Sequence, residues 1–314
     1  MHPGACTIFL WLPIRQPRLL WKLCGEASRL GCNVVLDLED SLDTPGTSAR
    51  ERASARDRLA QFVSVYGPRI RTGLGLRINR LATDDFQADI DCLRHCTAHR
   101  WAFLFLPKLS AGPEYAAVAD VLALNHVHVD SLVPIIETVA GLTNLGEILD
   151  AARGSTRYVQ FGHFDYCYDA GIWPFWEMAG DDYWQSVAPL IRRVEAHGLS
   201  FINSACQQLR DASALPYVVD RLAGACALPF GQATLSLGQS WFVRTRSTAQ
   251  HVLPPCPERR DAREMALYVV DSFRRHRESA RSFVTDEDGT FIPPQAYRAA
   301  LRYLGEREAV ACAR

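Results

Sequence analysis

Short apolar runs alternate with longer amphipathic stretches along most of the chain. The apolar runs predict eight strands, at residues 8–13, 33–38, 73–78, 101–106, 132–136, 157–161, 199–202 and 225–232. Apolar residues at helical spacing predict helices between them, at residues 17–30, 50–66, 84–97, 114–124, 142–152, 184–197 and 212–222. Eight strand and helix steps in this order predict the α/β fold class and, within it, a (β/α)8 TIM barrel. The eighth strand has the weakest pattern.

The composition changes near the C-terminal end of the chain. Residues 254–257 read Pro-Pro-Cys-Pro, which is a stiff break, and helices are expected at 258–281 and 294–304. The sequence therefore predicts a TIM-barrel catalytic domain at residues 1–253 and a helical C-terminal extension at residues 254–314. We expect this extension to act as a lid or as an oligomer contact.

The loop after the sixth predicted strand is rich in large aromatic residues, from Trp173 to Trp184. One interpretation is a loop packed by its own side chains. The other is a lid or a subunit contact, since aromatic residues anchor both. We expect a homo-oligomer.

Length and composition allow a large core and exclude some classes of partner. The chain has 314 residues, of which 48% are hydrophobic and 22% charged. A net charge of −1 creates no long-range field for nucleic acid or anionic membranes. The segment Met1 to Pro13 does not resemble a signal peptide or a spanning helix, and the ten cysteines show no pairing rhythm. We therefore expect a reduced, cytoplasmic protein without nucleic-acid or membrane partners.

A group of cysteines and histidines at residues 92–99 could suggest a metal site. On a helix, positions i and i+4 share a face, so the pair Cys92 and Cys96 projects from a different face than the pair His95 and His99. No second group of ligands lies near in sequence. We interpret these four as ordinary helix residues.

Charged residues gather where the predicted strands end. In a TIM barrel the loops at the carboxyl ends of the strands build the active site, so these residues are functional candidates. The candidates are Asp37, Glu39 and Asp40 after the second strand, Arg77 and Asn79 after the third, Lys108 after the fourth, Glu137 after the fifth, and His163 and Asp165 after the sixth. Only Lys22 and Lys108 among the 34 basic residues are lysines, which limits Schiff-base chemistry to two candidates.

Glu137 and Asp165 end consecutive strands of the predicted barrel. Carboxylates from the ends of neighbouring parallel strands lie side by side, which suits a hard divalent cation. Such a cation needs few protein carboxylates when substrate and water complete its shell, so the pair predicts Mg²⁺ or Mn²⁺. Taken singly, each carboxylate could instead be a helix cap or a solvated charge; as a pair they favour the metal.

Two interpretations of Arg77 are open. Its planar guanidinium can grip the carboxylate of an acid substrate through two hydrogen bonds. Alternatively, Arg77 is a structural ion-pair partner of Asp37 or Asp40.

Six short motifs occur in order over residues 9–171. They are Phe9-Leu10-Trp11-Leu12-Pro13 with Pro17, Val34-Val35-Leu36-Asp37-Leu38-Glu39-Asp40, Leu76-Arg77-Ile78-Asn79 with Thr83, Leu106-Pro107-Lys108, Ile135-Ile136-Glu137-Thr138 with Gly141, and Phe161-Gly162-His163-Phe164-Asp165 with Gly171. Each motif alone is weak, but the ordered set is specific. It resembles the HpcH/HpaI aldolase and citrate lyase beta-chain family, as a divergent member whose last third matches poorly.

The resemblance implies a TIM barrel, usually oligomeric, that binds Mg²⁺ or a similar ion through the residues matching Glu137 and Asp165. It also implies that the arginine matching Arg77 contacts the carboxylate or carbonyl of the substrate. The metal then stabilises an enolate that forms when a carbon–carbon bond breaks or forms. Typical substrates of the family are 3-hydroxyacyl-CoA thioesters and 4-hydroxy-2-oxo acids.

The chain departs from the family in segments that serve coenzyme A and proton transfer. Citrate lyase-like members carry a lysine soon after the acidic motif, whereas the corresponding residues 44–48 of this chain read Thr-Pro-Gly-Thr-Ser. Those members also carry the motif Gly-Lys-x-x-Ile-His-Pro-x-Gln, and the corresponding residues 231–239 of this chain lack its lysine, histidine and proline. The malyl-CoA lyase lid motif Asp-Gly-Lys-Met-x-Asp corresponds to residues 288–293, which end in proline. These differences argue against coenzyme A recognition. They leave the general base open between His163 and Asp40, and a purely structural role for His163 is the alternative.

We therefore expect a Mg²⁺-dependent carbon–carbon lyase that acts next to an enolisable carbonyl of a small hydroxy- or oxo-acid, either free or as its CoA thioester. The expected metal ligands are Glu137 and Asp165, the catalytic candidates are Arg77, Asp40 and His163, and the substrate-binding candidates are Arg77, Asn79, Lys108, Asp37 and Glu39. Two alternatives stay open. One is a Schiff-base aldolase that uses Lys108, and the other is a non-catalytic descendant that keeps the pocket for metal and acid.

Overall fold

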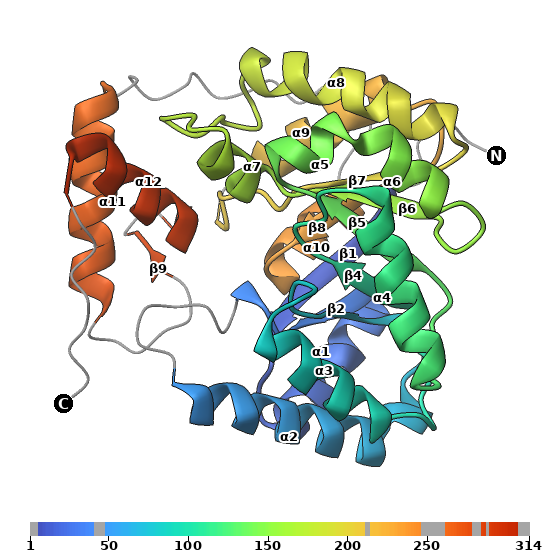
Figure 1. The fold of residues 1–314 in the computed structure, drawn as a ribbon. Coiled ribbons are helices and arrows are strands. Elements are labelled where there is room, and N and C mark those ends of the chain that lie inside the picture. The colour runs from blue at the N-terminus through green and yellow to red at the C-terminus, as the bar shows by residue number, and fades with distance from the viewer. Residues whose placement is uncertain are drawn as a thin grey trace.

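The computed structural model has eight parallel strands that close into a barrel, with helices around it and a helical region at the C-terminal end (Figure 1). It describes residues 6–40, 48–210, 214–245, 261–277, 284–286 and 289–306. The barrel strands are β1 Cys6–Pro13, β2 Asn33–Asp37, β3 Leu74–Arg77, β4 Phe103–Leu106, β5 Leu132–Ile136, β6 Tyr158–Phe161, β7 Ser200–Asn203 and β8 Phe230–Thr234. Neighbouring strands pair in chain order, and β8 pairs with β1. The predicted TIM barrel is confirmed.

Helices connect the strands, and a side-chain cap marks the start of α2. They are α1 Pro17–Arg29, α2 Ala49–Tyr66, the short η2 Gly67–Arg69, α3 Asp84–Arg94, α4 Gly112–Leu124, α5 Val139–Thr143, α6 Leu145–Ala151, α7 His163–Asp169, α8 Asp181–Ala196, α9 Ala214–Ala225, α10 Leu237–Thr245, α11 Ala262–Arg277 and α12 Pro294–Leu304. At the start of α2, the Glu51 N–H donates to Ser48 Oγ, and the Ser48 N–H donates back to Glu51 Oε2 at 2.7 Å. This reciprocal capping satisfies donors that the first turn of a helix leaves free.

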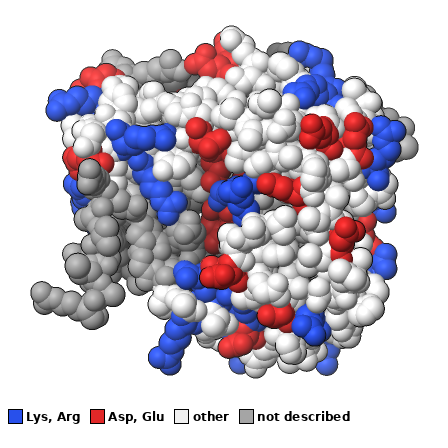
Figure 2. Space-filling model, in the orientation of Figure 1, with Lys and Arg blue, Asp and Glu red and all other residues white. Residues whose placement is uncertain are grey.

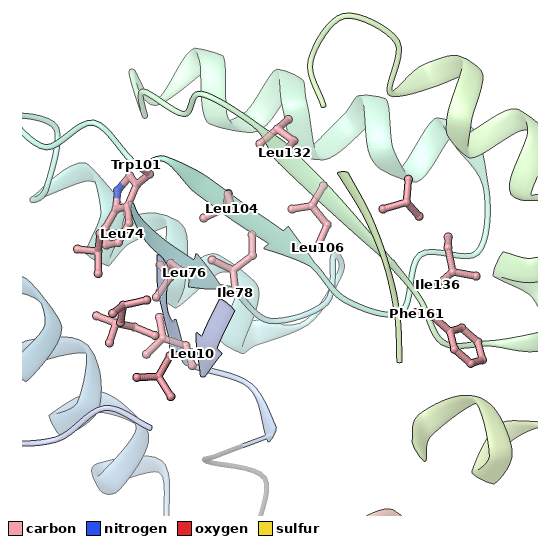
Figure 3. Packing of buried hydrophobic residues seen from close by; sticks show 14 of the residues in the cluster. Leu10, Leu74, Leu76, Ile78, Trp101, Leu104, Leu106, Leu132, Ile136 and Phe161 are labelled. Atoms are coloured by element: carbon pink, nitrogen blue, oxygen red, sulfur yellow. The ribbon is translucent and has the colours of Figure 1, made fainter. Parts of the chain in front are cut away.

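The side chains of each strand alternate between the inside of the barrel and the surrounding helices. In β1, Leu10 and Leu12 pack in the large core between strands and helices, whereas Phe9 and Trp11 pack with side chains inside the barrel. Figure 3 shows part of the outer core, where leucine and isoleucine side chains of neighbouring strands contact one another. Each fully buried side chain of this kind stabilises the fold by roughly 1.5–3 kcal/mol.

The predicted position of the eighth strand is wrong at its start. Helix α9 continues to Ala225, and β8 begins only at Phe230. The strand contains the fully buried Gln232, whose Nε2 donates to the Ser204 carbonyl oxygen at 2.7 Å. Gln232 closes the predicted range but lies in the middle of the observed strand, because its buried amide bonds to polar partners inside the barrel.

The helices also differ from the prediction in detail. The helix expected at 142–152 is two helices, α5 and α6, which meet at Asn144. The Asn144 side chain donates to the Ser110 carbonyl oxygen at 2.8 Å, which ties this break to the loop after β4. Helices α7 and α10 were not predicted. Residues 212–213 of the predicted helix at 212–222 lie outside the described residues.

The C-terminal extension has an apolar core of its own. Helices α11 and α12 pack with the hairpin of β9 Val284–Thr285 and β10 Phe291–Ile292, and the Phe273 and Tyr297 rings stack at 4.3 Å. In Figure 1 the extension, coloured orange to red, lies beside the barrel. The predicted break at 254–257 and the stretch 44–47 lie outside the described residues, so the domain boundary at residue 253 remains a prediction.

The aromatic loop after α7 packs against this extension of the same chain. Trp173 Nε1 donates to the Ala262 carbonyl oxygen at 2.9 Å, and Trp173 and Phe175 pack against the core of the extension. The expected oligomer contact remains a prediction.

None of the eight described cysteines forms a disulfide bond. Helix α3 ends at Arg94, so of the four residues interpreted as helix residues only Cys92 lies in the helix, and Cys96 is buried in the turn after it. No helix in the described part of the chain has the length and apolar character needed to cross a membrane. On the face shown in Figure 2, acidic and basic residues lie interspersed.

Candidate active site

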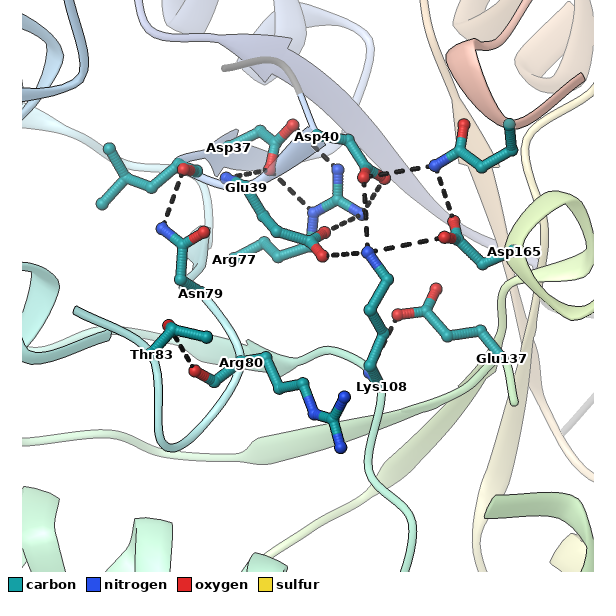
Figure 4. Close-up of polar contacts among 12 residues, drawn as sticks. Asp37, Glu39, Asp40, Arg77, Asn79, Arg80, Thr83, Lys108, Glu137 and Asp165 are labelled. Atoms are coloured by element: carbon teal, nitrogen blue, oxygen red, sulfur yellow. Dashed lines mark hydrogen bonds and ion pairs between the residues drawn. The ribbon is translucent and has the colours of Figure 1, made fainter. Parts of the chain in front are cut away.

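The charged residues predicted at the strand ends converge at one rim of the barrel (Figure 4). Strands β2 and β3 pair with Asp37 opposite Arg77, which places these side chains next to each other. Lys108 follows β4 and Glu137 follows β5, while Asp165 lies in the first turn of α7, directly after β6. The topology of the barrel thus gathers residues that are far apart in sequence.

Arg77 is held by three carboxylates from the end of β2. Its Nε and Nη2 donate to the two oxygens of Asp37 at 2.7 and 2.8 Å, and its Nη1 lies 2.8 Å from Asp40 Oδ2 and 3.0 Å from Glu39 Oε2. The guanidinium carbon also lies 4.9 Å from the centre of the Trp11 ring. Burial alone would lower the pKa of Arg77, but the three carboxylates outweigh it and hold this pKa well above its usual value. The ion pair expected from the structural interpretation of Arg77 is therefore present. It occupies most of the five N–H donors of the guanidinium.

Lys108 enters the same cluster from an uncommon backbone conformation, with φ at 52°. Its Nζ pairs with Glu39 and lies 3.4 Å from Asp165 Oδ1 and 3.6 Å from Asp40 Oδ1, while its backbone N–H donates to Glu137 Oε1 at 2.9 Å. Burial would lower the pKa of Lys108, but the surrounding carboxylates outweigh it and raise the pKa. An ammonium group held in this way is a poor nucleophile, so the surroundings disfavour the Schiff-base interpretation.

Glu137 and Asp165 are two acids with raised pKa values. Glu137 is 2% exposed, and the side chain of Asp165 is 14% exposed. Burial and then the charge of Asp165 raise the pKa of Glu137 well above its usual range. Burial and then the charge of Asp40 raise the pKa of Asp165 to about 6. Gly162 lies directly against Glu137. A Cβ atom at this position would overlap Glu137 Oε2, so only glycine fits here without a shift of the neighbouring side chain.

This pair of oxygen donors fits a divalent ion that keeps water or substrate ligands. Among the described residues, no group of three or more His, Cys, Asp or Glu side chains could hold a metal by itself. Mg²⁺ is commonly bound by one or two protein carboxylates, with water and substrate oxygens in its other octahedral positions. A bound cation also stabilises the ionised forms of buried acids, which burial alone disfavours.

Asp40 and Glu39 are neighbours whose pKa values shift in opposite directions. Burial would raise the pKa of Asp40, but Arg77 and Lys108 outweigh it and lower the pKa to about 2. Burial and then the charge of Asp40 raise the pKa of Glu39 to about 8. Asp40 is therefore ionised at neutral pH.

Asn79 bonds to groups outside the cluster. Its Nδ2 donates to the Leu38 carbonyl oxygen at 3.0 Å and to Asp89 Oδ2 at 2.8 Å. Asp89 is buried and also accepts a hydrogen bond from Arg56 Nε at 2.7 Å. Asn79 thus anchors the loop after β3 and does not line the cavity described below.

His163 lies at the start of α7 but apart from the acidic cluster. It is 1% exposed, and neither ring nitrogen has a hydrogen-bond partner among the described residues. The ring packs against Phe164, with centroids 3.9 Å apart, and against Tyr183 at 5.5 Å. Burial lowers the pKa of His163 to about 3. The structure does not bring this acid–base candidate to the cavity.

A cavity of about 160 Å³ lies between the rim and the C-terminal extension. Its charged and amide groups come from Asp37, Asp40, Arg77, Glu137, Gln160, Asp165 and Gln295. Its apolar wall includes Trp11, Phe164, Leu209, Leu235, Phe291 and Pro293. Neither Gln295 nor the apolar wall was predicted from the sequence. The lid-like stretch at 288–293 was the nearest signal, because it contains two of the lining residues.

Comparison with known proteins gives both a family and a fold. A model of the HpcH/HpaI aldolase/citrate lyase family matches residues 7–215. RipC from Yersinia pestis is 22% identical, with a TM-score of 0.58 over 78% of this chain and 97% of RipC. The citrate lyase beta subunit of Mycobacterium tuberculosis, solved with oxaloacetate and magnesium, is 20% identical, with a TM-score of 0.57 over 77% of this chain and 96% of that one. No curated protein matches the chain.

A third solved structure also covers the extension. Malate synthase from Haloferax volcanii, in a ternary complex with pyruvate and acetyl-CoA, is 15% identical, with a TM-score of 0.71. The alignment covers 96% of this chain and 90% of the malate synthase chain, so it includes most of the extension. At these identities the likeness shows a shared fold.

Proposed function

Because the chain belongs to the HpcH/HpaI aldolase/citrate lyase family, we propose that it is a Mg²⁺-dependent carbon–carbon lyase. It cleaves or forms the bond next to an enolisable carbonyl of a small hydroxy- or oxo-acid. The observation that carries this proposal is the pair of acids, Glu137 and Asp165, at the ends of adjacent strands.

Glu137 and Asp165 hold Mg²⁺ or Mn²⁺ in this proposal, and water and substrate oxygens complete the shell. When bound, the ion supplies Lewis-acid chemistry, which polarises the carbonyl and offsets the negative charge of the transition state. The citrate lyase beta subunit solved with magnesium and oxaloacetate supports this class of ligand.

The protein's own side chains orient the acid. Arg77 lines the cavity, and its fixed guanidinium presents positive charge to a substrate carboxylate. Lys108 contributes indirectly, because its ammonium group holds Glu39 and Asp165 in place.

Asp40 is the better supported of the two acid–base candidates. It lines the cavity, whereas His163 does not. Arg77 and Lys108 keep Asp40 ionised, so it can orient a water molecule, while its low pKa makes it a weak proton acceptor.

The metal assignment is tested with Glu137→Gln and a matched control, Glu147→Gln, on the exposed face of α6. Glutamine keeps the shape of the side chain and removes its charge. We expect Glu137→Gln to bind Mg²⁺ at least tenfold more weakly in calorimetry, whereas Glu147→Gln binds as the parent does. If Glu137→Gln binds Mg²⁺ like the parent, the assignment is wrong.

The reaction is tested by screening 4-hydroxy-2-oxo acids and 3-hydroxyacyl-CoA thioesters with Mg²⁺ and with EDTA. Turnover that EDTA abolishes supports the proposal. Turnover that survives EDTA, together with an adduct trapped by borohydride, supports a Schiff base on Lys108 instead. A parent that binds Mg²⁺ but turns over none of these compounds supports the non-catalytic alternative.

A further inference from the structure

The C-terminal extension delivers one amide side chain into the acidic cluster. Gln295 lies in the first turn of α12 and is 4% exposed. It is 130 residues away from Asp165 in the sequence, yet both line the same cavity. The two meet only because the extension is docked on the barrel.

Gln295 Nε2 bridges two carboxylates of the cluster. It lies 3.0 Å from Asp165 Oδ2 and 3.2 Å from Asp40 Oδ1. A carboxylate accepts hydrogen bonds, so the amide nitrogen must donate to both. An amide can donate here without adding a charge, whereas a carboxylate would be repelled.

Contacts elsewhere fix the position of Gln295. The Phe291 N–H donates to the Gln207 carbonyl oxygen at 2.8 Å, which holds the hairpin on the loop after β7. Arg302 donates to the Tyr168 carbonyl oxygen at 2.7 Å and lies 4.7 Å from the centre of the Tyr168 ring. Tyr168 belongs to α7, the same helix that carries Asp165. Gln295 and its carboxylate partner are therefore held on two elements that pack together.

We propose that Gln295 is a positioning residue of the metal site, and that it links binding of the divalent ion to docking of the C-terminal extension. This inference rests on the proposed function, since it takes Asp165 as a metal ligand. Hydrogen bonds from neighbouring side chains orient ligating carboxylates, and their loss typically costs about 10- to 100-fold in metal affinity. Because coupling between two equilibria is reciprocal, a bound ion also favours the docked extension.

The first test measures Mn²⁺ binding by electron paramagnetic resonance of the free ion. Parent, Gln295→Met and Gln87→Met are compared, since Gln87 is an exposed glutamine on α3. We expect Gln295→Met to raise the dissociation constant about 10- to 100-fold and Gln87→Met to leave it unchanged. Gln295→Asn, which keeps a shorter amide, replaces Gln295→Met if the latter does not fold.

The second test measures amide hydrogen exchange in residues 294–304 with and without Mg²⁺. We expect Mg²⁺ to slow exchange in the parent and to have less effect in Gln295→Met. If the parent binds Mn²⁺ and Gln295→Met binds it equally well, the inference is overturned and the proposed metal site stands. If the parent binds no Mn²⁺, the proposed function itself is overturned.

Discussion

Single residues set the charge balance of the site. Two cations face five carboxylates in the cluster, namely Arg77 and Lys108 against Asp37, Glu39, Asp40, Glu137 and Asp165. Uncompensated negative charge is costly away from water, and a divalent ion reduces it. The two cations therefore hold the acids in position, and because burial raises the pKa values of Glu39, Glu137 and Asp165, the proposed ion would compete with protons for these acids.

A substitution of His163 tests whether this residue has an acid–base role or only a structural one. Both ring nitrogens are buried without a partner among the described residues, and such groups typically cost about 1–3 kcal/mol each. We expect His163→Leu, which is similar in volume, to raise the free energy of unfolding in urea by at least about 2 kcal/mol, because it removes two such groups. Mg²⁺ binding should not change. A stable His163→Leu protein that has lost turnover would instead support the acid–base role expected from the sequence.

At the scale of elements, the strands that correspond to continuous apolar runs could be predicted from the sequence. The strands from β1 to β7 lie within three residues of their predicted bounds because most of their side chains are apolar. Strand β8 was placed too early because the apolar residues 225–228 at and after the end of α9 resemble a strand, and its end was missed because Gln232 is buried in the barrel with polar partners. The rim residues were predictable, since strand ends of a barrel meet at one face. Gln295 was not, because its position depends on how the extension docks.

The connection between α3 and β4 contains a histidine whose protonation should affect stability. The His99 ring packs edge-on against Trp101 at 4.8 Å, and burial lowers its pKa. Its pKa in the folded protein is therefore below the unfolded value of about 6.5. As the pH falls below about 6.5, the unfolded chain takes up a proton that the folded protein takes up only at lower pH, so stability decreases.

We accordingly expect His99→Gln to lose less stability than the parent when the pH is lowered from 7.5 to 5.5. Urea unfolding at the two pH values gives the comparison. The effect of one group is at most about 1.4 kcal/mol per pH unit. His128→Gln, at an exposed position, serves as the control and should follow the parent. Equal losses in His99→Gln and the parent would mean that this histidine titrates alike in both states.

At the scale of the whole molecule, segments from the first strand and the last helix line the same cavity. Trp11 of β1 and Gln295 of α12 line it together, so the site is complete only when barrel and extension are both folded and docked. The charged groups lie on the barrel rim, and the hairpin adds Phe291 to the apolar wall. This arrangement suits a small acid whose carboxylate and carbonyl face the rim.

The departures from the coenzyme A segments predict a free acid as the preferred substrate. A cavity of roughly 150 Å³ admits a molecule the size of benzene, so the cavity of about 160 Å³ suits the acid part of a substrate, and a pantetheine arm would have to extend through its open side. The segment at 231–239 also lacks the lysine and histidine of its citrate lyase-like counterpart. We expect kcat/KM to be at least tenfold higher for a free hydroxy- or oxo-acid than for its CoA thioester. The thioester of N-acetylcysteamine separates the effect of size from that of thioester activation. A CoA thioester that is turned over as well as the free acid would contradict this preference.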